Sequence, residues 1–218
     1  MNEQAKHLED SEILERLSEI LEHADDPQIS PKLARFGYSL DDLNHDRELL
    51  TKALGYRRIR EEAAGKSHAA YVAENRAEDL ARNAFFHLHR VIRQAQRHNP
   101  DLLLTPVLQL EQLPEDQEGF IKYGSALLKR IESHSAIEAA LAVLGVDGER
   151  RSELRVLLKT IRQAGMDQER EQDEAREARE HYHEVMAQLR ISYRTLHLIA
   201  REALVNDLQW MRLMGFRE

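Results

Sequence analysis

The spacing of apolar residues along the chain predicts amphipathic helices. Leucine and isoleucine recur with the three- and four-residue spacing of one helix face over residues 8–21, and glutamates fill half of the positions between them. Ser39, followed by two aspartates, is typical of a helix start, and no proline interrupts residues 32–99. We therefore expect a short first helix and a long second helix that continues to about His98.

The second half of the chain repeats this order. Apolar residues from Phe120 to Ile131 predict a third helix, and a further short helical segment should end at Gly145. Asp147 can cap a fourth helix that continues towards Leu204. The positions most prone to a kink or break are three glycines inside the long helices, Gly55, Gly65 and Gly165.

The two halves of the sequence align without a gap when Gly37 is placed opposite Gly145. Each of these glycines closes a Leu-Ala-x-x-Gly sequence. In the same alignment His89 lies opposite His197, and each histidine is part of a Leu-His-x-x-x-Arg-x-Ala sequence. Because the same motifs recur in the same order, we interpret the chain as an internal duplication.

The predicted fold is all-α. It is an elongated antiparallel four-helix bundle in which two helical repeats, residues 1–110 and 111–218, together form one domain, since neither repeat alone could cover its apolar stripe. Large apolar residues gather towards the ends of each long helix, whereas alanine and charged residues dominate the middle. We expect this middle part to be a coiled-coil-like stalk.

Composition narrows the classes of function. The 218 residues include no cysteine, which excludes disulfides, a thiol nucleophile and cysteine-ligated metals. The formal net charge of −8 disfavours a protein that mainly binds nucleic acid. No apolar run approaches the length that spans a bilayer, so we expect a cytoplasmic protein without a membrane segment.

Leu33-Ala-Arg-Phe-Gly-Tyr38, the long Ala/Glu/Gln-rich helix after it and the aromatic and basic helix end from Phe85 to Arg97 carry a resemblance. The chain resembles a group of uncharacterised bacterial proteins with two helical repeats. The resemblance covers both repeats and implies the all-helical fold. It implies no activity for any residue.

Two repeated stripes of basic side chains are candidates for binding an anionic ligand between the halves. Their spacings of seven and four residues place three side chains on one helix face. An alternative is that carboxylates of the first helix and of Glu111, Glu115 and Glu118 pair with these arginines inside the bundle. The stripes consist of Arg82, His89 and Arg93 in one half and Arg190, His197 and Arg201 in the other.

A metal site is a weaker candidate. Di-iron four-helix bundles use two Glu-x-x-His sequences, and Glu180-x-x-His183 is a single instance in a strongly charged stretch. We therefore expect no metal or other cofactor. The chain also lacks a glycine-rich phosphate loop, Gly-x-Ser-x-Gly and His-Glu-x-x-His, which disfavours an enzyme of familiar type.

The last segment of the sequence is unusually apolar. It either docks on the end of the bundle or contacts a partner, and the two interpretations are compatible. The function that these observations favour is a non-catalytic interaction or scaffold protein that binds a protein partner or associates with itself, for example as a homodimer. A ligand-binding bundle and a metal-dependent bundle enzyme are the alternatives. The candidate interface residues are Trp210, Met211, Met214 and Phe216.

Overall fold

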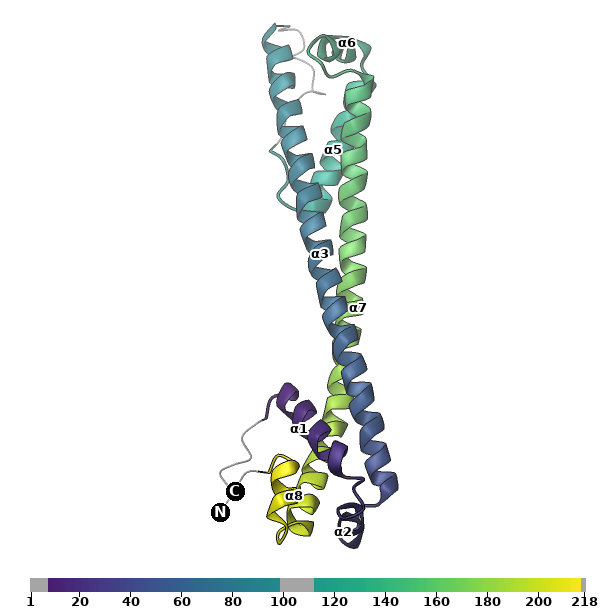
Figure 1. Cartoon of the computed structure of the whole chain (residues 1–218). Coiled ribbons are helices and arrows are strands. Elements are labelled where there is room, and N and C mark those ends of the chain that lie inside the picture. Colours follow the sequence, from purple (N-terminus) through teal and green to yellow (C-terminus); the bar gives the residue numbers. More distant parts are fainter. Residues whose placement is uncertain (1–7, 99–111, 217–218) are drawn as a thin grey trace. The chain divides into compact units, whose positions relative to one another are not determined.

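The computed structural model describes residues 8–98 and 112–216, and within them the chain is all-helical (Figure 1). Seven helices and no strand occur in these two ranges. The helices are α1 (Asp10–His23), α2 (Ser30–Arg35), α3 (Leu40–His98), α5 (Gln117–Glu132), α6 (Ser135–Val143), α7 (Gly148–Ala203) and α8 (Leu208–Leu213).

The two long helices start where the sequence predicts. Ser39 and Asp42 form a reciprocal cap, because the backbone N–H of each residue donates to the side chain of the other at 2.8 and 3.3 Å. The Asp147 carboxylate accepts from the backbone N–H of Arg150 at 2.9 Å. Both α3 and α7 continue through their internal glycines without interruption.

The short helices α2 and α6 end in the same way. Gly37 and Gly145 adopt φ angles of 85° and 84°, a left-handed conformation that glycine tolerates best. In each case the residue after the glycine donates its backbone N–H back to a leucine carbonyl, at 3.1 Å for Leu33 and 3.0 Å for Leu141. The predicted helix stops are therefore confirmed at both glycines.

The chain folds into two compact units, and each unit combines pieces of both halves of the sequence. Unit 1 comprises Met1–Ala64 and Glu174–Glu218, and unit 2 comprises Gly65–Asp173. Unit 1 thus contains α1, α2, α8, the beginning of α3 and the end of α7. Unit 2 contains α5, α6 and the remaining parts of α3 and α7.

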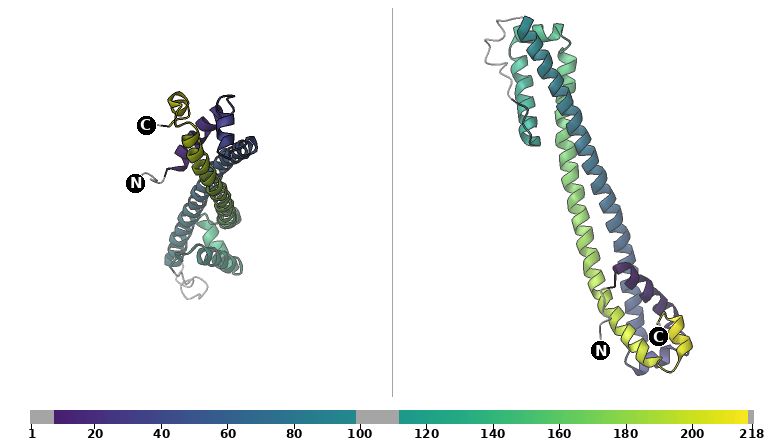
Figure 2. Two further views of the ribbon diagram at one scale, coloured as in Figure 1. Left: turned by 90° about the horizontal axis from the view of Figure 1, so that it is seen from below. Right: turned by 90° about the vertical axis from the view of Figure 1, so that its left-hand side faces the viewer.

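Each unit has its own hydrophobic core. In unit 1, Leu17 and Ile20 of α1 and Tyr182 of α7 are almost completely buried. In unit 2, α5 lies beside the α3 and α7 segments (Figure 2), and the rings of Phe85 and Phe120 meet edge to face at 5.4 Å. No apolar residue of α3 between Ala53 and Ala77 is buried, and the large apolar side chains Leu54, Ile59, Tyr71 and Val72 of this stretch are about half exposed.

The pattern of buried positions recurs between the halves. The long helices keep the register that pairs Gly37 with Gly145: for example, Leu88 and Leu196 are both buried. In α1 and α5 the register differs by one position, so that Ile13 of α1 corresponds to Phe120 rather than to Ile121. Counted between corresponding positions, the segment from α5 to α7 is therefore one residue longer than the segment from α1 to α3, a difference that the ungapped alignment does not include.

An arginine–carboxylate ion pair occurs at corresponding places in the two units. Arg47 of α3 contacts Asp25 at 2.7 Å, just after α1. Arg155 of α7 contacts Glu132 at the end of α5. Each pair joins the short first helix of its unit to the start of a long helix. The two arginines correspond in the register of the long helices, and the two carboxylates correspond in the register of α1 and α5.

Candidate functional site

The predicted stripe on α3 contacts α5 in unit 2. Arg82 is bound by the Glu78 carboxylate at 2.6 Å and donates to the backbone carbonyls of Pro114 and Glu115 at 2.7 and 2.6 Å. Its guanidinium also lies 4.7 Å from the centre of the Phe120 ring. An anion at Arg82 would have to displace these partners, so the contacts favour a structural role.

The carboxylates that bind this stripe are not the expected ones. Glu115 offers its backbone carbonyl rather than its side chain, and Glu118 pairs with Lys122 at 2.6 Å. Glu111 lies outside the described residues. The prediction of carboxylate partners from this segment is therefore wrong for Glu115 and Glu118, because Glu78 lies one turn away from Arg82 on the same helix.

The histidine of this stripe is held by a tyrosine. His89 is buried, and its Nε2 lies 2.8 Å from the hydroxyl of Tyr123 on α5. Burial lowers the pKa of His89, and the nearby charge of Arg93 lowers it further. Arg93 itself is exposed.

The stripe on α7 lies in unit 1. Arg190 forms an ion pair with Asp10 of α1, so the first helix does supply a carboxylate to this stripe. His197 is half-buried, and its ring lies 4.9 Å from that of Phe216. Burial lowers the pKa of His197, and the charges of Arg201 and Arg16 add to this effect. The two stripes therefore belong to different units.

Arg16 of α1 is a neighbour of His197 that sequence reasoning missed. The ungapped alignment pairs Arg16 with Gly124, which suggests no shared role. The burial register of α1 and α5 instead pairs Arg16 with Tyr123, the residue that contacts His89. A one-residue shift in the alignment could have found it.

The weak metal candidates do not gain support. Glu180 and His183 are both exposed on α7. Within residues 8–98 and 112–216, no group of three or more histidine, aspartate or glutamate side chains is placed to hold a metal ion.

The apolar C-terminal segment docks on unit 1. Met214 and Phe216 are buried in its core, and Trp210 and Met211 pack against that core while remaining partly exposed. A third left-handed glycine, Gly215, follows α8. Little of Met214 and Phe216 is left for contact with a partner.

A row of exposed apolar side chains on α7 was not identified from the sequence. Ile191, Leu198 and Val205 recur at every seventh position and are 67, 63 and 58% exposed. Ile191 and Leu198 lie on the same face of α7, and Val205 follows in the turn after it. We call these three residues the α7 row. Its heptad spacing is visible in the sequence, whereas its exposure is known only from the structure.

Exposed arginines border the α7 row. Arg194 and Arg201 each follow a member of the row by three positions, on the flank of α7 where Arg190 contacts α1. The corresponding face of α3 carries Asn83, Arg90 and Arg97 and is therefore polar. The apolar row is thus specific to unit 1.

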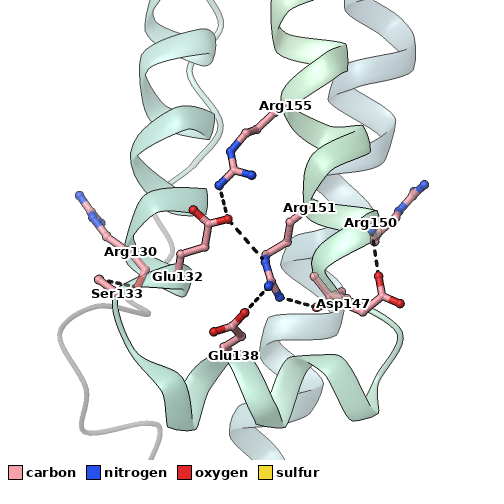
Figure 3. A network of polar contacts seen from close by, with 9 residues as sticks. Arg130, Glu132, Ser133, Glu138, Asp147, Arg150, Arg151 and Arg155 are labelled. Carbon is pink, nitrogen blue, oxygen red and sulfur yellow. Dashed lines mark hydrogen bonds and ion pairs between the residues drawn. The ribbon is translucent and has the colours of Figure 1, made fainter.

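A cluster of charged side chains around the buried Arg151 connects α5 and α6 to α7 in unit 2 (Figure 3). Arg151 is 5% exposed and contacts Glu138 of α6, while its Nε lies 3.7 Å from Glu132 at the end of α5 and has no hydrogen-bond partner. It also donates to the Val146 carbonyl at 3.1 Å. At the corresponding position unit 1 has Leu43, so this cluster is not required by the fold.

We expect Arg151→Leu to keep or raise the free energy of unfolding, because a buried ion pair contributes little over an apolar side chain. Glu138→Ala should lower the free energy of unfolding by about 1–2 kcal/mol, since it leaves the buried guanidinium with only the more distant carboxylate of Glu132. Urea denaturation followed by circular dichroism measures the free energy of unfolding of both variants. In the Arg151→Leu background Glu138→Ala should cost almost nothing, and an undiminished cost would contradict this interpretation.

Comparison with models of known protein families, with curated proteins and with solved structures finds no match for this chain. Helices that could cross a bilayer are absent from the part of the chain that the structure describes.

Proposed function

We propose that this chain is a non-catalytic helical protein that acts by associating with protein, and that its first partner is a second copy of itself. The observation that carries the proposal is the α7 row. Large apolar side chains in register on one exposed helix face are typical of a surface that is covered by another helix.

Charge favours a second copy as the partner. The α7 row is bordered by the positive charges of Arg194 and Arg201, so a complementary surface is acidic. The exposed face of α1 carries such a surface, with glutamates spaced three and four positions apart, and the whole chain has a net charge of −8. These residues are Glu12, Glu15, Glu19 and Glu22.

A two-fold arrangement satisfies both features at once. The α7 rows of two copies meet across the axis, and the arginine flank of each copy meets the acidic face of α1 of its mate. A standard interface buries ~800 Å² and about 20–30 residues per partner. The three side chains of the row are too few for this, so α1 must contribute the remainder. Both elements belong to unit 1.

An internal duplication supports this division of roles. We propose that the two repeats share one ancestral half, because the glycine stops, the buried positions and the Arg47–Asp25 and Arg155–Glu132 pairs recur in nearly constant register. An elongated antiparallel four-helix bundle is the arrangement that we propose for these repeats. Features present in one repeat only, such as the α7 row, are then candidates for function rather than for folding.

Charge reversal tests the partner. We expect Arg194→Glu to weaken self-association at least tenfold, because it places two acidic faces against each other. Glu15→Arg should do the same, and the mixture of the two variants should associate better than either variant alone. Sedimentation velocity over a range of concentrations gives these affinities.

Arg90→Glu is the matched control, since Arg90 is an exposed arginine at the position in unit 2 that corresponds to Leu198. It should leave association unchanged. Association that is insensitive to Arg194→Glu, or that Arg90→Glu weakens equally, would contradict the proposal.

A further inference from the structure

A small hollow forms in unit 1 where α1, the end of α7 and the segment after α8 meet. Its volume is about 10 Å³, and its lining includes Arg16, Tyr193, His197 and Phe216. This is room for about one water molecule, so a larger group can only bind at its mouth.

Positive charge gathers at this hollow. Arg16 of α1 lines the hollow together with His197. Arg201 follows His197 by four positions, one turn further along the same face of α7, and the charges of both arginines lower the pKa of His197. Both arginines are exposed, and neither has an ion-pair partner among the described residues. This differs from Arg190 on the same face of α7, which is bound by Asp10.

Acidic side chains are near this cluster but form no ion pair with it. Glu12, Glu15 and Glu19 lie within four positions of Arg16 on α1, and none of them pairs with Arg16 or Arg201 among the described residues. The carboxylate of Glu19 lies against the backbone of Gly215, which lines the hollow: a Cβ added there would be 2.7 Å from Glu19 Oε2. Within the described residues Glu19 makes no ion pair with Arg16, although it follows Arg16 by three positions, a spacing that allows such a pair on a helix. The His197 ring is likewise without a hydrogen bond to any described side chain and packs against aromatic rings.

Unit 2 provides an internal comparison. There the position of Arg16 is occupied by Tyr123, which bonds to His89 at 2.8 Å, and the rings of the two residues lie 5.6 Å apart. His89 is therefore satisfied within the fold, with Arg93 as the one arginine acting on it among the described residues. In unit 2, Tyr123 makes an internal hydrogen bond to His89. In unit 1, Arg16 takes the place of this tyrosine and adds a positive charge that faces solvent.

We propose that Arg16, His197 and Arg201 bind a tetrahedral oxyanion of the sulfate or phosphate class at the mouth of this hollow, and that unit 2 has no such site. Guanidinium groups bind these anions through paired N–H donors, and a protonated imidazole adds a third charged donor. Binding therefore takes up a proton at His197 and strengthens as the pH falls. Sulfate is the suitable probe because its charge does not change over the pH range in which histidine titrates.

The pKa of each histidine, followed by NMR of the ring Cε1–H signals, tests the site. Sulfate should raise the pKa of His197 by roughly 0.5 or more relative to chloride at matched ionic strength, and the pKa of His89 should not respond. Arg16→Tyr, which copies the arrangement of unit 2, should remove the sulfate effect. Arg16→Gln is a second variant of an exposed position, and unchanged ring signals of Tyr182 and Tyr193, which are buried in the core of unit 1, verify that the variants fold.

Three results would overturn the proposal: no response of His197, an equal response of His89, or a response that survives Arg16→Tyr and Arg16→Gln. Arg201 also borders the α7 row, so the titration is repeated in Ile191→Ser/Leu198→Ser, which removes the apolar contact alone. A sulfate response retained in that variant shows that the anion site does not depend on self-association.

Discussion

Phe85→Ala should lower the free energy of unfolding by about 3–5 kcal/mol, which is the largest effect that we expect from a single substitution. Phe85 is completely buried in unit 2, where it packs edge to face on Phe120. Its ring also fills the space above Gly124 of α5: a Cβ added there would lie 2.8 Å from Cζ of Phe85. The corresponding residue of α1 is Leu17, so the two units divide this space differently.

Gly124→Ala should therefore destabilise the protein by about 1–3 kcal/mol on its own, because the ring of Phe85 must move. In the Phe85→Ala background the same change should be neutral or stabilising, since the added methyl group enters the cavity. Thermal and urea unfolding of the four proteins gives the coupling energy. Additive effects of the two substitutions would contradict the packing described here.

Asp46→Ala should lower the free energy of unfolding by about 2–4 kcal/mol. The Asp46 carboxylate is 1% exposed in unit 1 and accepts hydrogen bonds from the hydroxyls of Tyr38 and Ser192, the latter at 2.5 Å. Burial and the contact with Asp46 raise the pKa of Tyr38, which therefore stays protonated and donates. Alanine leaves both hydroxyls without an acceptor.

Unit 2 indicates how this cost can be avoided. At the positions of Asp46 and Ser192 it has Leu154 and Ala84. We expect the triple variant Tyr38→Phe/Asp46→Leu/Ser192→Ala to be within about 1 kcal/mol of the wild type, because no polar group is then left unsatisfied. A triple variant as unstable as Asp46→Ala would contradict the correspondence of the two units.

Local signals made much of the fold predictable. Ser39 and Asp147 mark helix starts, and Gly37 and Gly145 mark helix ends, because capping and left-handed backbone depend on a few neighbouring residues. The absence of proline from the long helices correctly predicted their length. The short α8 was missed, since its few residues cannot establish a periodic pattern.

Contacts between distant helices were not predictable to the same degree. The Tyr38–Asp46–Ser192 contact depends on which parts of α3 and α7 lie side by side in unit 1, and spacing along one helix does not contain this information. Arg16 was missed because the alignment that matches the long helices is wrong by one position for α1 and α5, and it therefore pairs Arg16 with Gly124 instead of Tyr123. The α7 row has a clear heptad spacing, but only its exposure separates it from a core stripe.

Sedimentation equilibrium of the full chain decides whether the α7 row joins two copies, because it measures the mass of the assembled protein. We expect the wild-type chain to form a dimer that dissociates on dilution, and Ile191→Ser/Leu198→Ser to be a monomer at all concentrations. These substitutions are at exposed positions, so helical content by circular dichroism should be unchanged. A wild-type chain that is monomeric at every concentration, or a dimer that survives both substitutions, would contradict the proposed role of the α7 row.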